Sequence, residues 1–412
     1  MQAIFGIAVL LGLAWLLSEN RGRFDWRVLV SALTMQVALA AVLLKAPVLS
    51  EMLLSVNGLV RAVEQATQVG TGFVFGYLGG GPAPFEVNVE SALYLFSFRV
   101  LPQILVFSAL VAILWHWRVL PVIIRAFGAA LRRTLGVGGA VGTAAAASLF
   151  LGMAEAPLVI RAYLAKLTRS ELFSVMTCGM ATIAGSIMVL YAGVLQEVID
   201  GALGHILVAS AINVIGAILI SRLMIPVAGA TAADEAPVSL SYAGTMDAIT
   251  RGTADGLRLA LYIGAMLIVL VSLVALVNLI LSNVQIGGAA LTLERAMGWA
   301  FAPVAWLIGV PWAEAQTAGS LLGTKLVLNE LVAYLQLTAL GPAELSGHSR
   351  LILTYALCGF TNFGSLGILI GGLSTLVPER RSDFLELGSK TLISGTLVSC
   401  LTGAIIGLVA RL

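Results

Sequence analysis

Two apolar segments of this chain each contain one glutamate, and each is followed by the same glycine-interrupted pattern. After Glu155 comes CGMATIAGSI at 178–187, and after Glu330 comes CGFTNFGSL at 358–366. With a one-residue gap, both stretches read Cys-Gly-apolar-small-polar-apolar-Gly-Ser-apolar. A duplicated unit in which an acid accompanies a glycine-broken helix is typical of the central binding site of a secondary transporter.

The composition places the chain in a membrane. Charged residues make up 11% of the 412 residues, hydrophobic residues make up 59%, and the mean hydropathy is +1.01. Because a soluble domain usually carries roughly a quarter charged residues, we expect an all-α polytopic membrane protein. The net charge of +2 gives no argument for nucleic acid as a partner. The three cysteines lie in apolar segments and predict no disulfide framework.

The apolar runs predict eight transmembrane helices, each close to the roughly 20 residues needed to cross a bilayer. We expect the first run to be a span rather than a signal peptide, because no basic residue precedes it. Amphipathic stretches at 51–79, 118–133 and 242–257 predict helices in the membrane interface. The eight runs are 3–17, 28–48, 92–115, 172–195, 202–223, 257–282, 351–376 and 389–410.

Charge predicts the orientation. With the loop at 18–27 on the cytoplasmic side, sixteen Lys and Arg residues fall inside and five fall outside, which places both termini outside. The stretches 138–168 and 317–345 must then each enter and leave on one side, turning at 152–157 and near Asn329. Such re-entrant hairpins enter from opposite sides, so 138–223 and 317–412 are predicted to be inverted repeats of hairpin, broken span and span.

The residues at the hairpin turns and helix breaks carry the chemistry. A glutamate at membrane depth costs several kcal/mol and indicates function, although it could also cap a turn or pair with a buried cation. Next to the breaks, Asn362 and Ser365 offer an amide and a hydroxyl group, and Thr182 offers a hydroxyl group. Phe360 could stack on a flat ring or belong to the core. Glu314 is expected to be a solvated or capping acid.

The chain resembles the bacterial concentrative nucleoside transporters. The resemblance rests on GMAEAPL at 152–158, TRSEL at 168–172, FAP at 301–303, GVPW at 309–312, NELVAY at 329–334 and GFTNFGS at 359–365. It implies a homotrimer in the bacterial inner membrane, with both termini periplasmic, that takes up nucleosides by an elevator mechanism and needs no cofactor beyond a coupling ion. The scaffold would comprise 1–137 and 224–316, and the transport domain 138–223 and 317–412.

The resemblance also assigns the substrate-binding residues. It implies that Glu330, Asn362 and Ser365 hold the ribose, and that Met153, Ala154, Glu155, Ile187 and Phe360 surround the base. The family usually has Gln-Thr or Gln-Ser where this chain has Met153-Ala154. Because these side chains cannot hydrogen-bond a base edge, the base preference could be broader, weaker or shifted.

A second departure concerns the coupling ion. The resemblance implies a sodium site made of Ser148, the Leu151 carbonyl, the Thr182 hydroxyl and the Ile183 carbonyl. Sodium-coupled members have Asn where this chain has Ser148, and the shorter ligand weakens a hard-cation site. We therefore favour H+ over Na+, with Glu155 as the proton carrier, because a buried carboxyl group can titrate near neutral pH.

Other functions fit the sequence less well. A transporter of another polar metabolite, such as a modified nucleoside or a nucleobase, is the alternative that Met153-Ala154 permits. An intramembrane hydrolase using Glu155 and Glu330 as an acid–base pair is remote, because no nucleophile or metal-ligand set accompanies them and it leaves the inverted repeat unexplained. A passive channel is disfavoured because paired hairpins indicate alternating access. We therefore expect a transporter and not an enzyme.

Overall fold

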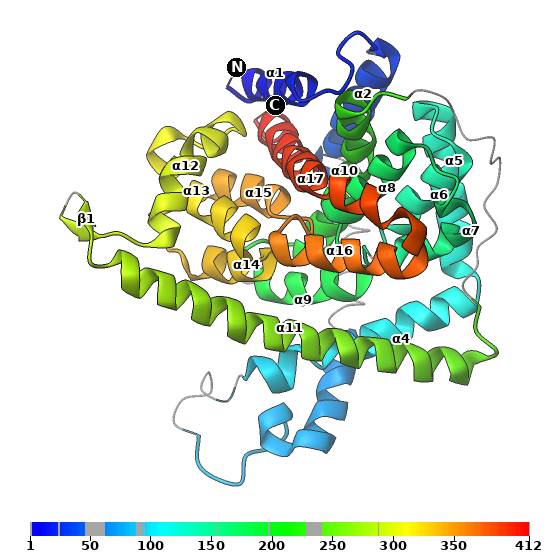
Figure 1. The fold of residues 1–412 in the computed structure, drawn as a ribbon. Coiled ribbons are helices and arrows are strands. Elements are labelled where there is room, and N and C mark those ends of the chain that lie inside the picture. The colour runs from blue at the N-terminus through cyan, green and yellow to red at the C-terminus, as the bar shows by residue number, and fades with distance from the viewer. Residues whose placement is uncertain are drawn as a thin grey trace.

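The computed structural model describes residues 2–23, 25–45, 62–87, 93, 95–153, 155–196, 198–227, 241–286 and 288–411. The described chain is a helical bundle with one short hairpin, in which β1 (Gln285–Ile286) pairs antiparallel with β2 (Ala289–Ala290). Figure 1 shows α4 and the long α11 running along one side of the bundle, with α10 and α17 inside it. The bounds of these helices are α4 Gln103–His116, α10 Ala202–Met224, α11 Thr245–Leu281 and α17 Arg381–Val409.

The two central helices are apolar or small on nearly every face. Most residues of α10 and α17 are buried, which is the pattern expected for helices surrounded by protein. The helices α1 (Gln2–Leu16) and α2 (Trp26–Lys45) pack against α10 and α17. The core of the molecule therefore lies around α10 and α17.

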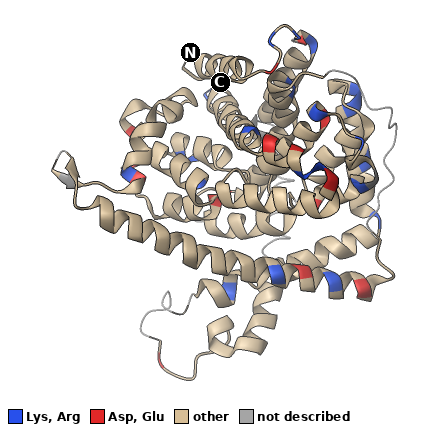
Figure 2. Ribbon diagram, in the orientation of Figure 1, with Lys and Arg blue, Asp and Glu red and all other residues tan. Residues whose placement is uncertain are grey.

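The long helix α11 has the opposite character. It extends over 37 residues, and most of its apolar side chains are exposed, including Leu261, Ile268 and Leu279. Figure 2 shows its charged residues gathered toward one end. Near that end Gly252 and Gly256 face α4 so closely that a Cβ atom at Gly256 would lie 2.8 Å from the Cα atom of Leu105. This is the close helix approach that a Gly-x-x-x-Gly spacing permits in membranes.

Both predicted hairpins are present. The first consists of α6, a turn, η4 and α7, and η4 packs back against α6. The second consists of α13 and α14, and the side chain of Asn329 caps α14 by accepting a hydrogen bond from the Val332 amide. The bounds are α6 Gly139–Ala147, η4 Ala156–Ile160, α7 Arg161–Leu164, α13 Trp312–Val327 and α14 Glu330–Ala339.

Both predicted helix breaks are also present. The first separates α8 (Arg169–Ala181) from α9 (Gly185–Leu195), and the second separates α15 (Gly347–Ala356) from α16 (Phe363–Leu376). The two breaks begin at different places within the repeated sequence pattern. Cys178 lies inside α8, whereas Cys358 lies beyond the last residue of α15, because the second break begins earlier in its pattern.

The two hairpins begin at opposite ends of α17. Near its C-terminal end, Arg411 donates to the carbonyl of Gly309, just before α13, and Gln2 donates to the carbonyl of Val310. Near its N-terminal end, Arg380 donates to the carbonyls of Leu164 and Leu167, at the point where the chain leaves the first hairpin. The two chain termini therefore lie at one end of the bundle, as Figure 1 also shows.

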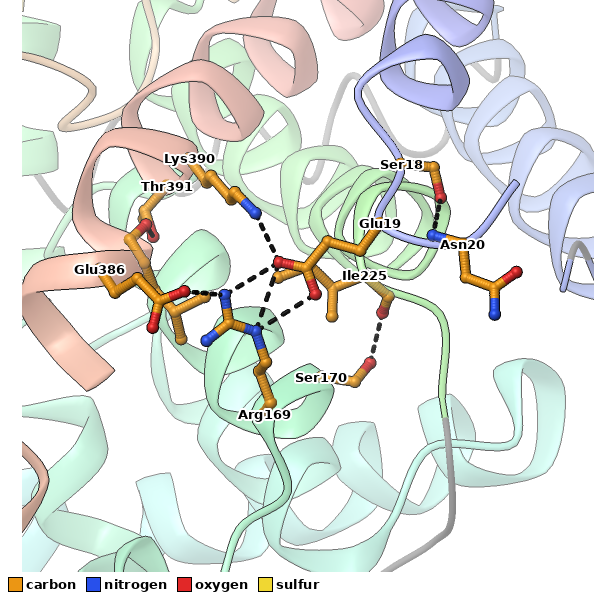
Figure 3. Close-up of polar contacts among 10 residues, drawn as sticks. Ser18, Glu19, Asn20, Arg169, Ser170, Ile225, Glu386, Lys390 and Thr391 are labelled. Atoms are coloured by element: carbon orange, nitrogen blue, oxygen red, sulfur yellow. Dashed lines mark hydrogen bonds and ion pairs between the residues drawn. The ribbon is translucent and has the colours of Figure 1, made fainter. Parts of the chain in front are cut away.

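A network of ion pairs joins three segments at the end opposite the termini (Figure 3). Glu19, in the α1–α2 connection, accepts from Arg169 at the start of α8 at 2.9 Å and from Lys390 of α17 at 2.5 Å. Arg169 also pairs with Glu386 at 2.7 Å. The guanidinium group therefore bridges two carboxylates, and the α1–α2 connection is tied to α8 and α17.

Some sequence predictions need correction. The stretch 242–257 is not a separate interfacial helix, because from Thr245 it continues into the following span as α11. The segment before α13 contains a helix that was not predicted, α12 (Leu293–Leu307), which bends by 116° into α13.

Two of the stretches predicted to be amphipathic helices are helical in the described residues. The stretch 118–133 forms the amphipathic helix α5 (Val119–Leu135). Of the stretch 51–79, residues 62–75 are helical and 51–61 lie outside the described residues. Among the described residues, five helices are long and apolar enough to cross a membrane, or six if the α12–α13 pair is one span. The count of eight spans stays a prediction.

Candidate functional site

A cavity of about 160 Å³ lies between the hairpin turns, the helix breaks and α11. It brings together the two glutamates that the sequence placed in separate repeats. The lining divides into a polar group of side chains from the second repeat and α9, and an apolar group from the first hairpin, the breaks and α11. The polar group is Tyr191, Asn329, Glu330, Asn362 and Ser365, and the apolar group includes Met153, Ile187, Leu259, Ile263, Met266, Leu270, Phe360 and Ile368.

Glu330 is the centre of the polar group. It is the first residue of α14, and only 3% of its surface is exposed. Its Oε1 atom accepts a hydrogen bond from the Tyr191 hydroxyl at 2.5 Å, and its Oε2 atom accepts one from Nδ2 of Asn362 at 3.1 Å. Both carboxylate oxygens are therefore oriented before any ligand arrives, and each keeps a further lone pair for a donor.

Asn362 is held by its position at the N-terminus of α16. Its Oδ1 atom accepts from the Ser365 amide at 2.7 Å and thereby caps the helix. Because the carbonyl oxygen makes the cap, the amino group is the part that faces Glu330. The short Asn-x-x-Ser sequence thus fixes the orientation of the amide and presents Ser365 in the first turn of the same helix.

Glu155 differs from Glu330. It lines the cavity from the first hairpin, where its side chain is exposed and Oε2 accepts from the Gly152 amide at 3.0 Å. The capping role considered from the sequence is thus present, but a carboxylate has further acceptor positions. Glu155 therefore remains accessible from the cavity, whereas Glu330 is enclosed by its partners.

The apolar group contains the residues that the sequence assigned to a base. Met153, Ile187 and Phe360 all line the cavity and are all buried. Ala154 lies outside the described residues. Helix α11 contributes Met266 and Tyr262 to the lining. An aromatic ring and several flexible aliphatic side chains are suited to a flat heterocycle.

Tyr191 is a site residue that sequence reasoning missed. It lies four residues after Ile187 on α9, so the two side chains share one face of the helix. That spacing from an already named residue was the available signal. The Tyr191 ring also packs on Tyr334, with ring centroids 5.3 Å apart, and the Tyr334 hydroxyl donates to the Thr354 carbonyl.

The two helix breaks are joined by one buried amide, which the sequence analysis did not identify. Nδ2 of Asn213, on α10, donates to the carbonyls of Ala181 and Cys358 at 2.8 and 2.9 Å. Its Oδ1 atom accepts from the Thr402 hydroxyl of α17 at 2.6 Å. Asn213 therefore satisfies carbonyls at the ends of both α8 and α15, and links both central helices.

The breaks also contact each other directly. The Phe360 amide donates to the Thr182 carbonyl at 3.3 Å, and the Thr361 hydroxyl donates to the Met180 carbonyl at 2.9 Å. Gly359, with a φ of +133°, permits this approach because a Cβ atom there would lie 2.6 Å from the Ala181 carbonyl oxygen. The second break is therefore hydrogen-bonded directly to the backbone of the first break.

The four residues of the expected sodium site are all buried near the first break. The Phe150 carbonyl accepts from the Gly185 amide, which holds the tip of the first hairpin against that break. The hydroxyl of Ser148 donates to the carbonyls of Ala144 and Ala145, and that of Thr182 donates to the carbonyl of Cys178. Leu151 and Ile183 offer only backbone oxygens.

Two further predictions concern metals and capping. Within the described part of the chain, no group of three or more His, Cys, Asp or Glu residues could hold a metal ion. Glu314 accepts from the amide and the hydroxyl of Ser346, directly before α15. The interpretation of Glu314 as a capping acid is confirmed.

Family profiles match most of the chain. A profile described as "Na+ dependent nucleoside transporter C-terminus" matches residues 205–407, and the corresponding N-terminus profile matches 5–78. A profile described as "Nucleoside recognition" matches 97–197.

Individual proteins are similar over their whole length. An uncharacterized transporter of Haemophilus influenzae is 39% identical over 99% of this chain and 97% of its own. The nucleoside permease NupC of Helicobacter pylori is 36% identical over 98% of this chain and 97% of its own. The structure of CNTnw in an inward-facing substrate-bound state has a TM-score of 0.91 at 36% identity, covering 100% of this chain and 97% of that one.

Proposed function

Because this chain belongs to the concentrative nucleoside transporter family, we propose that it takes up nucleosides across the bacterial inner membrane together with a cation. The protein is a transporter and not an enzyme. The observation that carries the proposal is that one cavity is lined both by the polar side chains of Glu330, Asn362 and Ser365 and by the apolar side chains of Phe360 and Ile187. A ribose and a base require that combination of polar and apolar surfaces.

We place the ribose of the nucleoside next to the polar group of side chains. Two vicinal hydroxyl groups donate to Glu330, whose oxygens are already oriented by Tyr191 and Asn362. Ser365 supplies a further donor or acceptor. The base then lies between Phe360 and Ile187, next to Met153 and Glu155. A free nucleobase would leave the polar group without partners, so we favour a nucleoside.

The base receives few directed hydrogen bonds. Met153 is a thioether side chain, and Glu155 can only accept when ionised. We therefore propose a broad base preference, favouring bases that offer a donor to Glu155. A modified nucleoside or another polar metabolite is the alternative substrate that this lining permits.

We favour the proton as the coupling ion, with sodium as the second candidate. The hydroxyl groups of Ser148 and Thr182 donate back to their own helices, and serine is a short ligand. Glu155, exposed to the cavity and held by one amide, is suited to accept and release a proton. Sodium is favoured by the description of the family profile, with Ser148, Leu151, Thr182 and Ile183 as its ligands.

We further propose that transport proceeds by an elevator movement in a homotrimer. The transport domain comprises 138–223 and 317–412, and the scaffold comprises 1–137 and 224–316. Support comes from the cavity, which lies between the hairpin turns and α11. Because α1 and α2 of the scaffold pack against α10 and α17 of the transport domain, we place α1 and α2 at the contact between the two domains. Both termini would face the periplasm.

Uptake into proteoliposomes tests the function. Radiolabelled uridine, cytidine, adenosine and inosine are supplied with an imposed proton gradient, a sodium gradient, both or neither. We expect accumulation above equilibrium with the proton gradient alone. Accumulation that requires sodium would select the second ion, and the absence of gradient-driven accumulation of any nucleoside would refute the assignment.

A further inference from the structure

Lys325 is a buried cation that the proposed mechanism does not use. It lies in the last turn of α13, five residues before Glu330, and only 4% of its surface is exposed. A buried ammonium group is costly unless hydrogen bonds or opposite charge compensate it. Its Nζ atom donates to the Ala356 carbonyl and to the Ser399 hydroxyl, both at 2.9 Å.

The Ala356 carbonyl lies at the C-terminal end of a helix. Ala356 is the last residue of α15, so its carbonyl is one of those that an α-helix leaves without an internal partner. The helix dipole also makes that end partially negative. Lys325 therefore places a full positive charge at the point where the second broken helix is interrupted, and links α13 of the hairpin to α15 and α17.

The first broken helix ends differently. The last carbonyls of α8 receive hydrogen bonds from Asn213, Thr361 and the side chain of Thr182, all of which are uncharged donors. The residues expected to hold a cation there, such as Ser148, are also uncharged. The end of the broken helix thus meets a lysine side chain in one repeat and only amide and hydroxyl donors in the other.

We propose that Lys325 is a positioning residue that supplies the second repeat with a built-in cation, so that only the first repeat depends on an exchangeable one. The inference rests on the proposed function, because it concerns how nucleoside and cation binding are divided between the repeats. The ammonium group holds the second hairpin against the helix break, and so keeps Glu330 beside Asn362.

Replacing the lysine separates its charge from its volume. Lys325→Met keeps most of the side-chain volume but removes the charge, Lys325→Arg keeps the charge, and Lys325→Ala leaves a space that n-propylammonium fits. The exposed Lys166 provides a matched control as Lys166→Met. Binding of the tightest-binding nucleoside among uridine, cytidine, adenosine and inosine is measured on purified protein, together with melting temperature.

We expect Lys325→Ala and Lys325→Met to weaken nucleoside binding by about tenfold or more, because charge-assisted hydrogen bonds are lost. Lys325→Arg should bind more tightly than either. Millimolar n-propylammonium should restore binding to Lys325→Ala and have no effect on wild type or on Lys166→Met. Transport should recover in parallel.

Other outcomes would overturn the inference. Wild-type affinity in Lys325→Met would show that the lysine only fills space, and a folded Lys325→Ala that alkylammonium does not rescue would remove the role of the charge. If the lysine variants do not fold, Ser399→Ala removes one acceptor with little change in packing. It should weaken binding by about threefold, because one hydrogen bond is lost, and unchanged affinity would contradict the inference. A wild-type protein that binds no nucleoside would instead refute the proposed function itself.

Discussion

Replacing Glu330 with glutamine tests the polar half of the cavity with little change in shape. Each carboxylate oxygen now accepts one hydrogen bond, from Tyr191 or from Asn362. Asn362 cannot turn its amide to suit a glutamine, because its carbonyl oxygen caps α16. The new amide must therefore point its oxygen at Asn362 and its nitrogen at Tyr191, and it loses one acceptor position on the ligand side.

The size of the effect follows from the bonds that change. A hydrogen bond to a charged acceptor contributes about 1.5–3 kcal/mol, against about 0.5–1.5 kcal/mol for a neutral pair. Each of two ribose hydroxyl groups loses about 1 kcal/mol of charge assistance, and one also loses its remaining hydrogen bond of about 0.5–1.5 kcal/mol, which gives a loss of roughly 2.5–3.5 kcal/mol. We expect the nucleoside Kd of Glu330→Gln to rise roughly 60- to 300-fold, since about 1.4 kcal/mol is tenfold.

The measurement is titration calorimetry on purified protein, with gradient-driven uptake as the second readout. Glu344→Gln is the matched control, because Glu344 also accepts a hydrogen bond from a backbone amide at a turn, that of Gly341, but is exposed and is not among the residues that line the cavity. The control should bind and transport as wild type does. A Glu330→Gln protein that binds nucleoside within threefold of wild type would refute the ribose role of Glu330.

Further predictions concern the link between the repeats, the ion-pair network and the base. Asn213→Ala should lower the free energy of unfolding by about 3 kcal/mol, because buried carbonyls lose their donor, while the exposed Asn283→Ala should change it little; thermal melts compare them. Arg169 lowers the pKa of the Glu19 carboxyl below its usual 4.5. The stabilisation that Glu19 provides is therefore present above the unfolded-state pKa and is lost as the pH falls through the lower folded-state pKa. Wild type should melt above Glu19→Gln at pH 7, with the difference vanishing in acid, and a constant difference would contradict this. Met153→Gln should raise affinity up to about tenfold for bases with a hydrogen-bonding edge, by one hydrogen bond, and leave other bases unchanged in a binding panel.

The elements predicted correctly are those specified by nearby residues. The second hairpin turns where Asn329 caps the following helix, and the second break ends where Asn362 caps α16. In both cases the sequence signal is a capping asparagine that lies within four residues of the turn or break. The sequence therefore located the turns and the breaks, and seven of its eight expected substrate-binding residues line the cavity.

The contacts that were missed join residues far apart in the chain. Tyr191 and Glu330 are separated by 139 residues, and Asn213 and Cys358 by 145. Lys325 was missed for the same reason, because its partners Ala356 and Ser399 lie 31 and 74 residues away in the chain. Each contact depends on how the helices pack, which hydropathy along the chain does not describe.

The error in α11 has a similar cause. Charged residues at its start suggested an interfacial helix, yet no proline interrupts the sequence and the helix continues. Gly252 and Gly256 allow the charged half to rest on α4. The helix α12 was missed because its length alone did not mark it as a span.

At roughly 1.5 Å per residue, the 37 residues of α11 form a rod about 55 Å long, against a hydrocarbon layer of roughly 30 Å. Such a rod must lean steeply or extend into the water, and its inclination changes when the lipid tails become shorter or longer. Since Tyr262 and Met266 are carried on this rod and line the cavity, acyl-chain length becomes a means of moving one wall of the site. Reconstitution into bilayers of graded thickness would therefore alter ligand affinity without any change in the protein.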